Sequence, residues 1–161
     1  MGFKCSECGR VHEELARYFM WRLPEMADGS TIQAEEEHKS MCRTEDQSFV
    51  RCEVEVPITG SEGGPLGFIL WVEVDSKDYE RISAFRSDEE TTPIPRGLVA
   101  GTLANPVSGV PGSFGTPVKF EVCKGDPTPY VKWVEPGSSL AALLRTGASV
   151  KFWHDVAARN S

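Results

Sequence analysis

The middle of the chain most constrains the fold, because it has the pattern of two consecutive strands. From Phe49 to Ile58 apolar residues alternate with charged ones, which is the two-residue period of a strand with one buried face. The apolar face carries Val50, Cys52, Val54, Val56 and Ile58, and the opposite face carries Arg51, Glu53 and Glu55. Residues 59–66 are rich in glycine and proline and predict a hairpin connection. Residues 67–75 follow as a second strand with apolar side chains on both faces, so we expect a central, covered position for it.

The remaining elements predict an α+β domain. We expect three further strands, over Gly97–Leu103, Pro117–Cys123 and Tyr130–Val134. Helices are expected over Glu13–Leu23, 77–85, 139–146 and from Ser149 onward. At 161 residues the chain is long enough for one well-filled core and too short for two, so residues 1–161 are predicted to form a single domain. The predicted fold is a mostly antiparallel sheet flanked by N- and C-terminal helices.

The charge balance argues against nucleic acid as a partner. The chain has 17 basic and 24 acidic residues and a net charge of -7, so it has no basic surplus to displace counterions. This balance suits a basic protein partner instead. The acidic segment 27–46 includes Glu35–Glu37 and is expected to be either a short exposed helix or a mobile loop.

Hydropathy and cysteine content bear on the compartment. No apolar run approaches the roughly 18 residues of a membrane span, and the first residues lack the charged-then-apolar pattern of a signal peptide. The five cysteines are an odd number spread over the chain, which is not the pattern of a disulfide framework. We therefore expect a cytoplasmic protein with reduced thiols and no membrane partner.

The strongest site signal lies between residues 5 and 12. Cys5 and Cys8 are three positions apart and are followed by Gly9, a spacing that directs two thiolates at one metal ion. His12 is the expected third ligand and Cys42 the expected fourth, which predicts a Zn2+ site of Cys5, Cys8, His12 and Cys42. The alternative is a pair of free thiols near the N-terminus. A thioredoxin-like redox role is disfavoured, because only four residues precede Cys5 and leave no room for a buried strand.

Other candidate residues have simpler interpretations. Cys52 lies on the apolar face of its strand and is expected to be a core residue, with a reserve role as a zinc ligand. Cys123 is expected to be an exposed thiol. Cys42 and His38 would lie one helical turn apart in a helix, but a solvated histidine is the favoured interpretation. The glycines from Gly63 to Gly67 lack the lysine and the following helix of a phosphate-binding loop, so they are interpreted as a hairpin turn.

Several short motifs occur in a fixed order along the chain. They are Cys5-x-x-Cys8-Gly9-x-x-His12-x-x-Leu15, Phe49-Val50-Arg51-Cys52-x-Val54-Glu55-Val56-Pro57-Ile58-x-Gly60, Gly101-x-Leu103-x-Asn105, Phe114-x-Thr116 and Leu140-Ala141. In this order they resemble the bacterial domain-of-unknown-function family 2199 over nearly the whole chain. The departures are a shifted tryptophan at Trp71 and the lack of a His-Pro pair before Leu140.

The resemblance implies a small bacterial cytosolic protein and implies no activity. It also implies that Cys5, Cys8, His12 and Cys42 occupy the places where the family has its cysteines and histidine. Together with the residue patterns, it leads us to expect a non-enzymatic, zinc-stabilised binding or structural domain. Two alternatives stay open: a zinc-dependent enzyme with an open coordination position, and an acidic adaptor or immunity-like protein that binds a basic partner.

Overall fold

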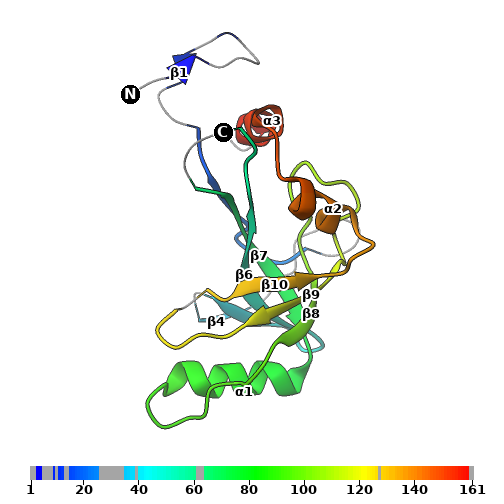
Figure 1. Ribbon diagram of the computed structural model, residues 1–161. Coiled ribbons are helices and arrows are strands. Elements are labelled where there is room, and N and C mark those ends of the chain that lie inside the picture. The colour runs from blue at the N-terminus through cyan, green and yellow to red at the C-terminus, as the bar shows by residue number, and fades with distance from the viewer. Residues whose placement is uncertain are drawn as a thin grey trace.

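A long antiparallel hairpin is the frame of the structure (Figure 1). It consists of β6 (Ser48–Val56) and β7 (Leu66–Val74), which pair along their whole length from Ser48↔Val74 to Val56↔Leu66. The computed structural model describes residues 3–4, 9, 11–12, 15–25, 35–38, 40–60, 64–126 and 128–159, and for 3–4, 11–12 and 35–38 it describes the backbone alone. The hairpin, its glycine- and proline-rich connection and the central position of β7 confirm the sequence prediction for this region.

Three more strands close the hairpin into a five-stranded barrel. β8 (Val99–Leu103) pairs with β7, β9 (Pro117–Glu121) with β8, and β10 (Tyr130–Val134) with β9, all antiparallel. β10 then pairs with β6 at Tyr130↔Glu53, and this pairing is parallel. In a meander each strand runs opposite to the one before it, so in a closed ring of five the first and last strands must run in the same direction.

Three short strands add to the sheet outside the barrel, next to the two long strands. β3 (Tyr18–Met20) lies parallel to β7, and β5 (Met41–Arg43) lies antiparallel to β6 and pairs with β4 (Glu35–His38). A separate two-stranded sheet joins β1 (Phe3–Lys4) to β2 (Val11–His12).

Three helices complete the fold, α1 (Ser76–Ser87), α2 (Ser139–Thr146) and α3 (Val150–Arg159). Figure 1 shows α1 at one end of the barrel and α2 and α3 toward the other end, close to the C-terminus. The N-terminal N–H groups of α1 and α2 are capped by the side chains of Asp75 and Ser138, which accept from Asp78 N and Ala141 N. The helices predicted over 77–85, 139–146 and from Ser149 onward are confirmed, and Gly147 is the C-cap of α2.

The core fills the barrel interior and the space beneath the helices. Alternate residues of β6 point inward, and all four are almost fully buried: Val50, Cys52, Val54 and Val56. They pack with Phe68, Leu70 and Val72 of β7 and with buried residues of the helices, among them Ile82 and Trp153. A smaller cluster of Cys42, Phe49, Trp71 and Ala104 lies on the outer side of the same sheet, packed against Trp21.

The predicted fold class of a mostly antiparallel sheet flanked by terminal helices was wrong. The sheet is a closed barrel with added strands and short helices, because β10 returns to β6. The expected helix over Glu13–Leu23 is absent from the described part of that range, where residues 15–17 are irregular and β3 follows. Within the acidic segment 27–46, residues 35–38 and 41–43 form β4 and β5, which the sequence did not predict. No helix in the described ranges has the length and apolar content that crossing a membrane requires.

Candidate functional site

The structure describes two of the four predicted zinc ligands, His12 and Cys42. Cys5 and Cys8 lie outside the described residues. His12 is the last residue of β2 and pairs with Phe3 of β1, so the strands on either side of segment 5–10 are hydrogen-bonded neighbours. Gly9 has a positive φ of 70°, a backbone conformation that favours glycine in a tight turn. In the sequence, Cys5 and Cys8 fall between these two paired strands.

Cys42 lies in the small outer cluster. It is fully buried in β5 and belongs with Phe49, Trp71 and Ala104. Within the ranges that the structure describes, no three His, Cys, Asp or Glu side chains are grouped to hold a metal ion. Cys42 therefore belongs to no such group among the described residues, and its role as a zinc ligand stays a prediction.

The other two described cysteines have different surroundings. Cys52 is fully buried in the barrel core, which confirms the expectation. Burial raises the pKa of its thiol well above the ordinary value, and the Arg86 guanidinium partly opposes that rise. Cys123 is half-buried and its Sγ lies 3.9 Å from Glu121 Oε1.

A second constellation occupies the outer face where β3, β7, β6 and β10 lie side by side. The strand register aligns Tyr18 of β3 with Gly67 of β7 and Glu55 of β6. One row further it aligns Met20 with Ile69, Glu53 and Tyr130. The sequence placed Glu53 and Glu55 on the charged face of their strand, but it gave no indication that Tyr18 and Tyr130 lie in the same rows.

Glu53 is the most enclosed charged residue of this outer face. It is only 6% exposed, and its Oε1 would lie 3.0 Å from a Cβ added to Gly67, which would also lie 2.5 Å from Cδ1 of Tyr18. The Tyr18 ring and the Glu53 carboxylate therefore meet above Gly67. This approach requires glycine, because any side chain there would displace the ring or the carboxylate.

Burial raises the pKa of Glu53 above its ordinary value, and the neighbouring Glu55 carboxyl raises it further by hydrogen bonding and by its charge. The Tyr130 hydroxyl donates to Glu53 and opposes the rise, and Asp126 adds to it. In turn the charge of Glu53 is the largest cause that raises the pKa of Tyr130. Glu53 thus holds a proton more readily than an isolated glutamate does, because it is buried and lies beside a second carboxyl group.

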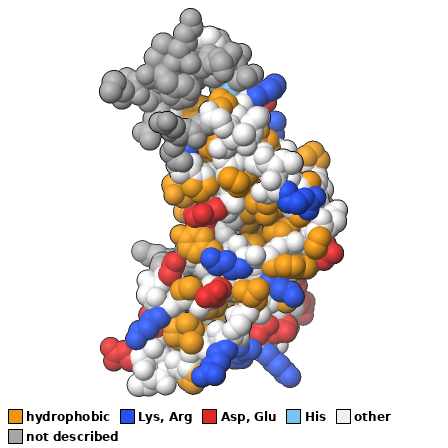
Figure 2. Space-filling view, viewed as in Figure 1, with side chains coloured by type: hydrophobic (Ala, Val, Ile, Leu, Met, Phe, Trp, Pro, Cys, Tyr) orange, Lys and Arg blue, Asp and Glu red, His pale blue; other side chains and the backbone are white. Residues whose placement is uncertain are grey.

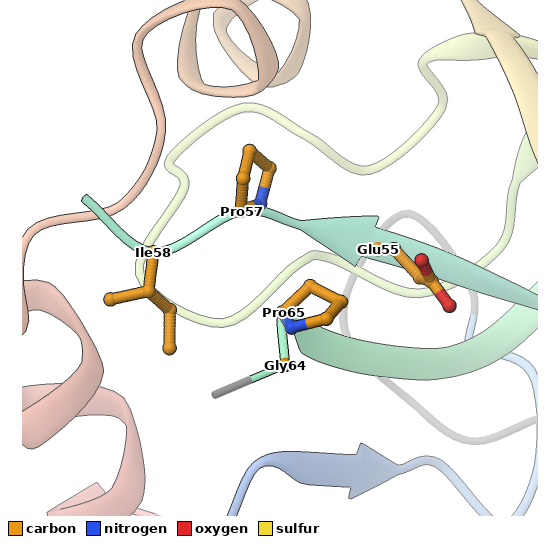
Figure 3. A pocket seen from close by; sticks show the side chains of 5 residues that line it. All are labelled: Glu55, Pro57, Ile58, Gly64 and Pro65. Carbon is orange, nitrogen blue, oxygen red and sulfur yellow. The ribbon is translucent and has the colours of Figure 1, made fainter. Parts of the chain in front are cut away.

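A shallow pocket of about 360 Å³ adjoins this pair at the closed end of the hairpin (Figure 3). It is lined by Glu55, Pro57 and Ile58 at the end of β6 and by Gly64 and Pro65 before β7. Figure 3 shows the two prolines close together, with Glu55 further along β6.

Basic groups near this region are already engaged. The guanidinium of Arg17 lies 4.3 Å from the centre of the Trp153 ring and donates to Gly64 O at 2.6 Å. Lys132 Nζ lies 5.6 Å from the centre of the Tyr130 ring. On the face shown in Figure 2, acidic and basic side chains are interspersed among hydrophobic ones.

Comparison with known proteins identifies a family and no characterised relative. A family model described as an uncharacterized protein conserved in bacteria matches residues 4–148. Neither a curated protein nor a solved structure matches the chain.

Proposed function

This chain belongs to the bacterial family DUF2199, and from that premise we propose that it is a non-enzymatic binding domain whose N-terminal hairpin is stabilised by zinc. The observation that carries the zinc part is the pairing of β1 with β2, with His12 opposite Phe3. This pairing supports the proposal because two thiols in the loop of a short hairpin, with a histidine at its base, supply ligands of the types that zinc prefers.

Zinc in this position has a structural purpose. β1 and β2 have two residues each and form a sheet of their own. A two-stranded hairpin alone is marginally stable in water, so it needs a further constraint. Zinc binding provides one, because the free energy of metal binding to such a segment is free energy of folding.

The binding part of the proposal is supported by the outer face of β3, β7 and β6. Tyr18 and Met20 are each 63% exposed and lie in register with Glu55 and Glu53 through β7. Aromatic residues and methionine are enriched in surfaces that bind other proteins.

The zinc content of protein purified without chelator tests the proposal, with the accessible thiols titrated in parallel. We expect close to one zinc per chain, and the double variant Cys5→Ser, Cys8→Ser should lose the metal and melt at a lower temperature. Cys123→Ser is the matched control, because this half-buried thiol is not among the proposed ligands. Metal-free protein, or a double variant that melts like the wild type, would refute the zinc part.

One observation favours the alternative of a zinc-dependent enzyme. Cys42 is enclosed in an apolar cluster, which leaves Cys5, Cys8 and His12 as three ligands, the number that catalytic zinc sites use with a bound water. X-ray absorption on the zinc-loaded protein separates the two, because a third sulfur beside the histidine nitrogen indicates a closed structural site. Three protein ligands and one water oxygen would favour the enzyme.

A further inference from the structure

The outer edge of β3 is open in the described part of the fold. β3 pairs with β7 on one side, and no described strand lies on its other side. Gly67 N donates to Arg17 O at 2.8 Å, and Trp21 N donates to Ile69 O at 2.9 Å. In a parallel ladder alternate residues bond to the same neighbour, so the N–H and C=O groups of Tyr18 and Met20 point away from β7.

β3 is a short edge strand of three residues, and none of them is a lysine or a proline. Such edges commonly carry lysine, proline or a bulge that prevents pairing with another chain. β3 has the sequence Tyr-Phe-Met, with Phe19 buried and the other two side chains 63% exposed. The edge is therefore equipped to accept a strand from another molecule.

The charge beside the edge specifies the chemistry of that strand. The Glu53 carboxylate meets the Tyr18 ring above Gly67, and Glu55 lies in the same row as Tyr18. An aromatic ring next to carboxylates favours lysine or arginine, because the ring face and the carboxylates both attract a cation.

We propose that β3 binds an extended basic peptide segment of a partner protein as an added parallel or antiparallel strand, with a lysine or arginine side chain lying over Tyr18 toward Glu53 and Glu55. The proposal rests on the binding role proposed above and is independent of the zinc part. It names the partner by its chemistry: an extended segment with alternating basic residues.

The distances permit this arrangement. Neighbouring strands lie about 4.8 Å apart, so an added strand would lie about 10 Å from β7. The Glu53 oxygen extends to the position above Gly67 in β7. An extended arginine side chain, which reaches roughly 7 Å, spans the remaining gap with a hydrogen bond of about 2.8 Å. The main-chain bonds would supply affinity, and the basic side chain would supply specificity.

The test uses fluorescein-labelled peptides and the full chain, with binding followed by fluorescence anisotropy at low and high salt. The probe is a ten-residue peptide of alternating lysine and valine, and its control has glutamate in place of lysine. We expect the lysine peptide to bind at least tenfold more tightly than the glutamate peptide, and high salt should weaken its binding. Equal binding of the two peptides would overturn the charge requirement and with it the proposal.

Strand addition is tested separately with Met20→Pro. This change removes the outward N–H of Met20 but leaves the bonds of β3 to β7, and proline is tolerated at a sheet edge that faces solvent. Met20→Ala is the matched control, because it removes the same side chain and keeps the N–H. We expect Met20→Pro to lower the affinity for the lysine peptide at least tenfold more than Met20→Ala does. Equal affinities would show binding by charge alone and overturn the proposal.

A peptide variant keeps the test decisive if Met20→Pro does not fold. N-methylation of alternate residues blocks one edge of the lysine peptide, so one of the two methylation registers should abolish binding to the wild-type chain. Full binding in both registers would refute strand addition. The Cys5→Ser, Cys8→Ser variant should retain the peptide affinity, so failure of the zinc proposal and failure of this one give different results.

Discussion

The side-chain oxygen of Asn105 accepts a hydrogen bond of 2.9 Å from the backbone N–H of Trp71, 34 residues away. The same side chain donates from Nδ2 to Leu23 O at 3.0 Å and is fully buried. One amide therefore joins the segment before β4, the strand β7 and the loop after β8. The ring nitrogen of Trp71 adds a second bond between the same parts, because it donates to Trp21 O at 3.2 Å.

Replacement of Asn105 by alanine should lower the free energy of unfolding by roughly 2–4 kcal/mol, because it leaves a buried N–H and a buried carbonyl without partners. Urea unfolding measures the change. Gln47→Ala is the control, since its amide makes one long bond of 3.3 Å to Glu73 at a half-buried position. A loss for Asn105→Ala no larger than that for Gln47→Ala would contradict the role given to this side chain.

The raised pKa of Glu53 makes a prediction about pH. The folded chain holds the proton on Glu53 more tightly than the unfolded chain, whose glutamates titrate near 4.5. Stability should therefore fall as the pH rises from about 4.5 through the folded pKa, because the unfavourable buried charge then forms. Glu53→Gln should reduce this fall and unfold at higher urea concentration at pH 7. The exposed Glu121→Gln should change neither, and equal pH profiles for wild type and Glu53→Gln would refute the assignment.

Arg86, on the last turn of α1, should contribute to the free energy of unfolding through its hydrogen bonds. Its Nη1 donates to Glu89 Oε1 at 3.1 Å and to Cys123 O at 3.3 Å, and its side chain is 10% exposed. Arg86→Ala should cost roughly 1.5–3 kcal/mol, the range for hydrogen bonds to charged groups. Arg81→Ala on the same helix removes an exposed pair with Asp78 and should cost less than about 0.5 kcal/mol. Thermal and urea unfolding of both variants decides, and similar costs would count against the buried role of Arg86.

Gly147 has a backbone conformation and surroundings that exclude a side chain. Its φ is 79°, and an added Cβ would lie 2.6 Å from Oγ1 of Thr59 and 3.2 Å from Pro57 O. Gly147→Ala should therefore destabilise by at least about 1–2 kcal/mol, the cost of the left-handed conformation alone. Gly137→Ala is the control, because an added Cβ there meets nothing within 4 Å. Unfolding experiments that find no difference between the two would contradict the contact with Thr59.

Local patterns predicted the elements that local physics determines. The alternation around Cys52 and Val54 identified the inward face of β6, because every second residue of a strand points to the same face and is apolar where that face is buried. The range 139–146 predicted α2 for an equally local reason, since the caps Ser138 and Gly147 depend on neighbouring N–H and C=O groups.

Long-range pairing determined what the sequence did not predict. Closure of the barrel depends on Tyr130 reaching Glu53, which are 77 residues apart in numbering, and no local pattern encodes that contact. Leu15 and Phe19 have helical spacing, but the bonds between β3 and β7 impose an extended backbone on Phe19. The same holds for the outer face: the sequence shows Glu53 and Glu55, but only the register of β3 and β7 places Tyr18 beside them.

The parallel pairing of β10 with β6 has a consequence for how the molecule assembles. The β6–β7 hairpin joins residues that are near in sequence, so its loop closes at low entropic cost and it can form early. The seam at Tyr130 and Glu53 closes a much longer loop and is held by few bonds, among them that of Glu53 N to Pro129 O. In hydrogen exchange, the amides that bond β6 to β7 should therefore exchange more slowly than the amide of Glu53, which bonds to Pro129. The barrel should open between β10 and β6 before the β6–β7 hairpin unfolds.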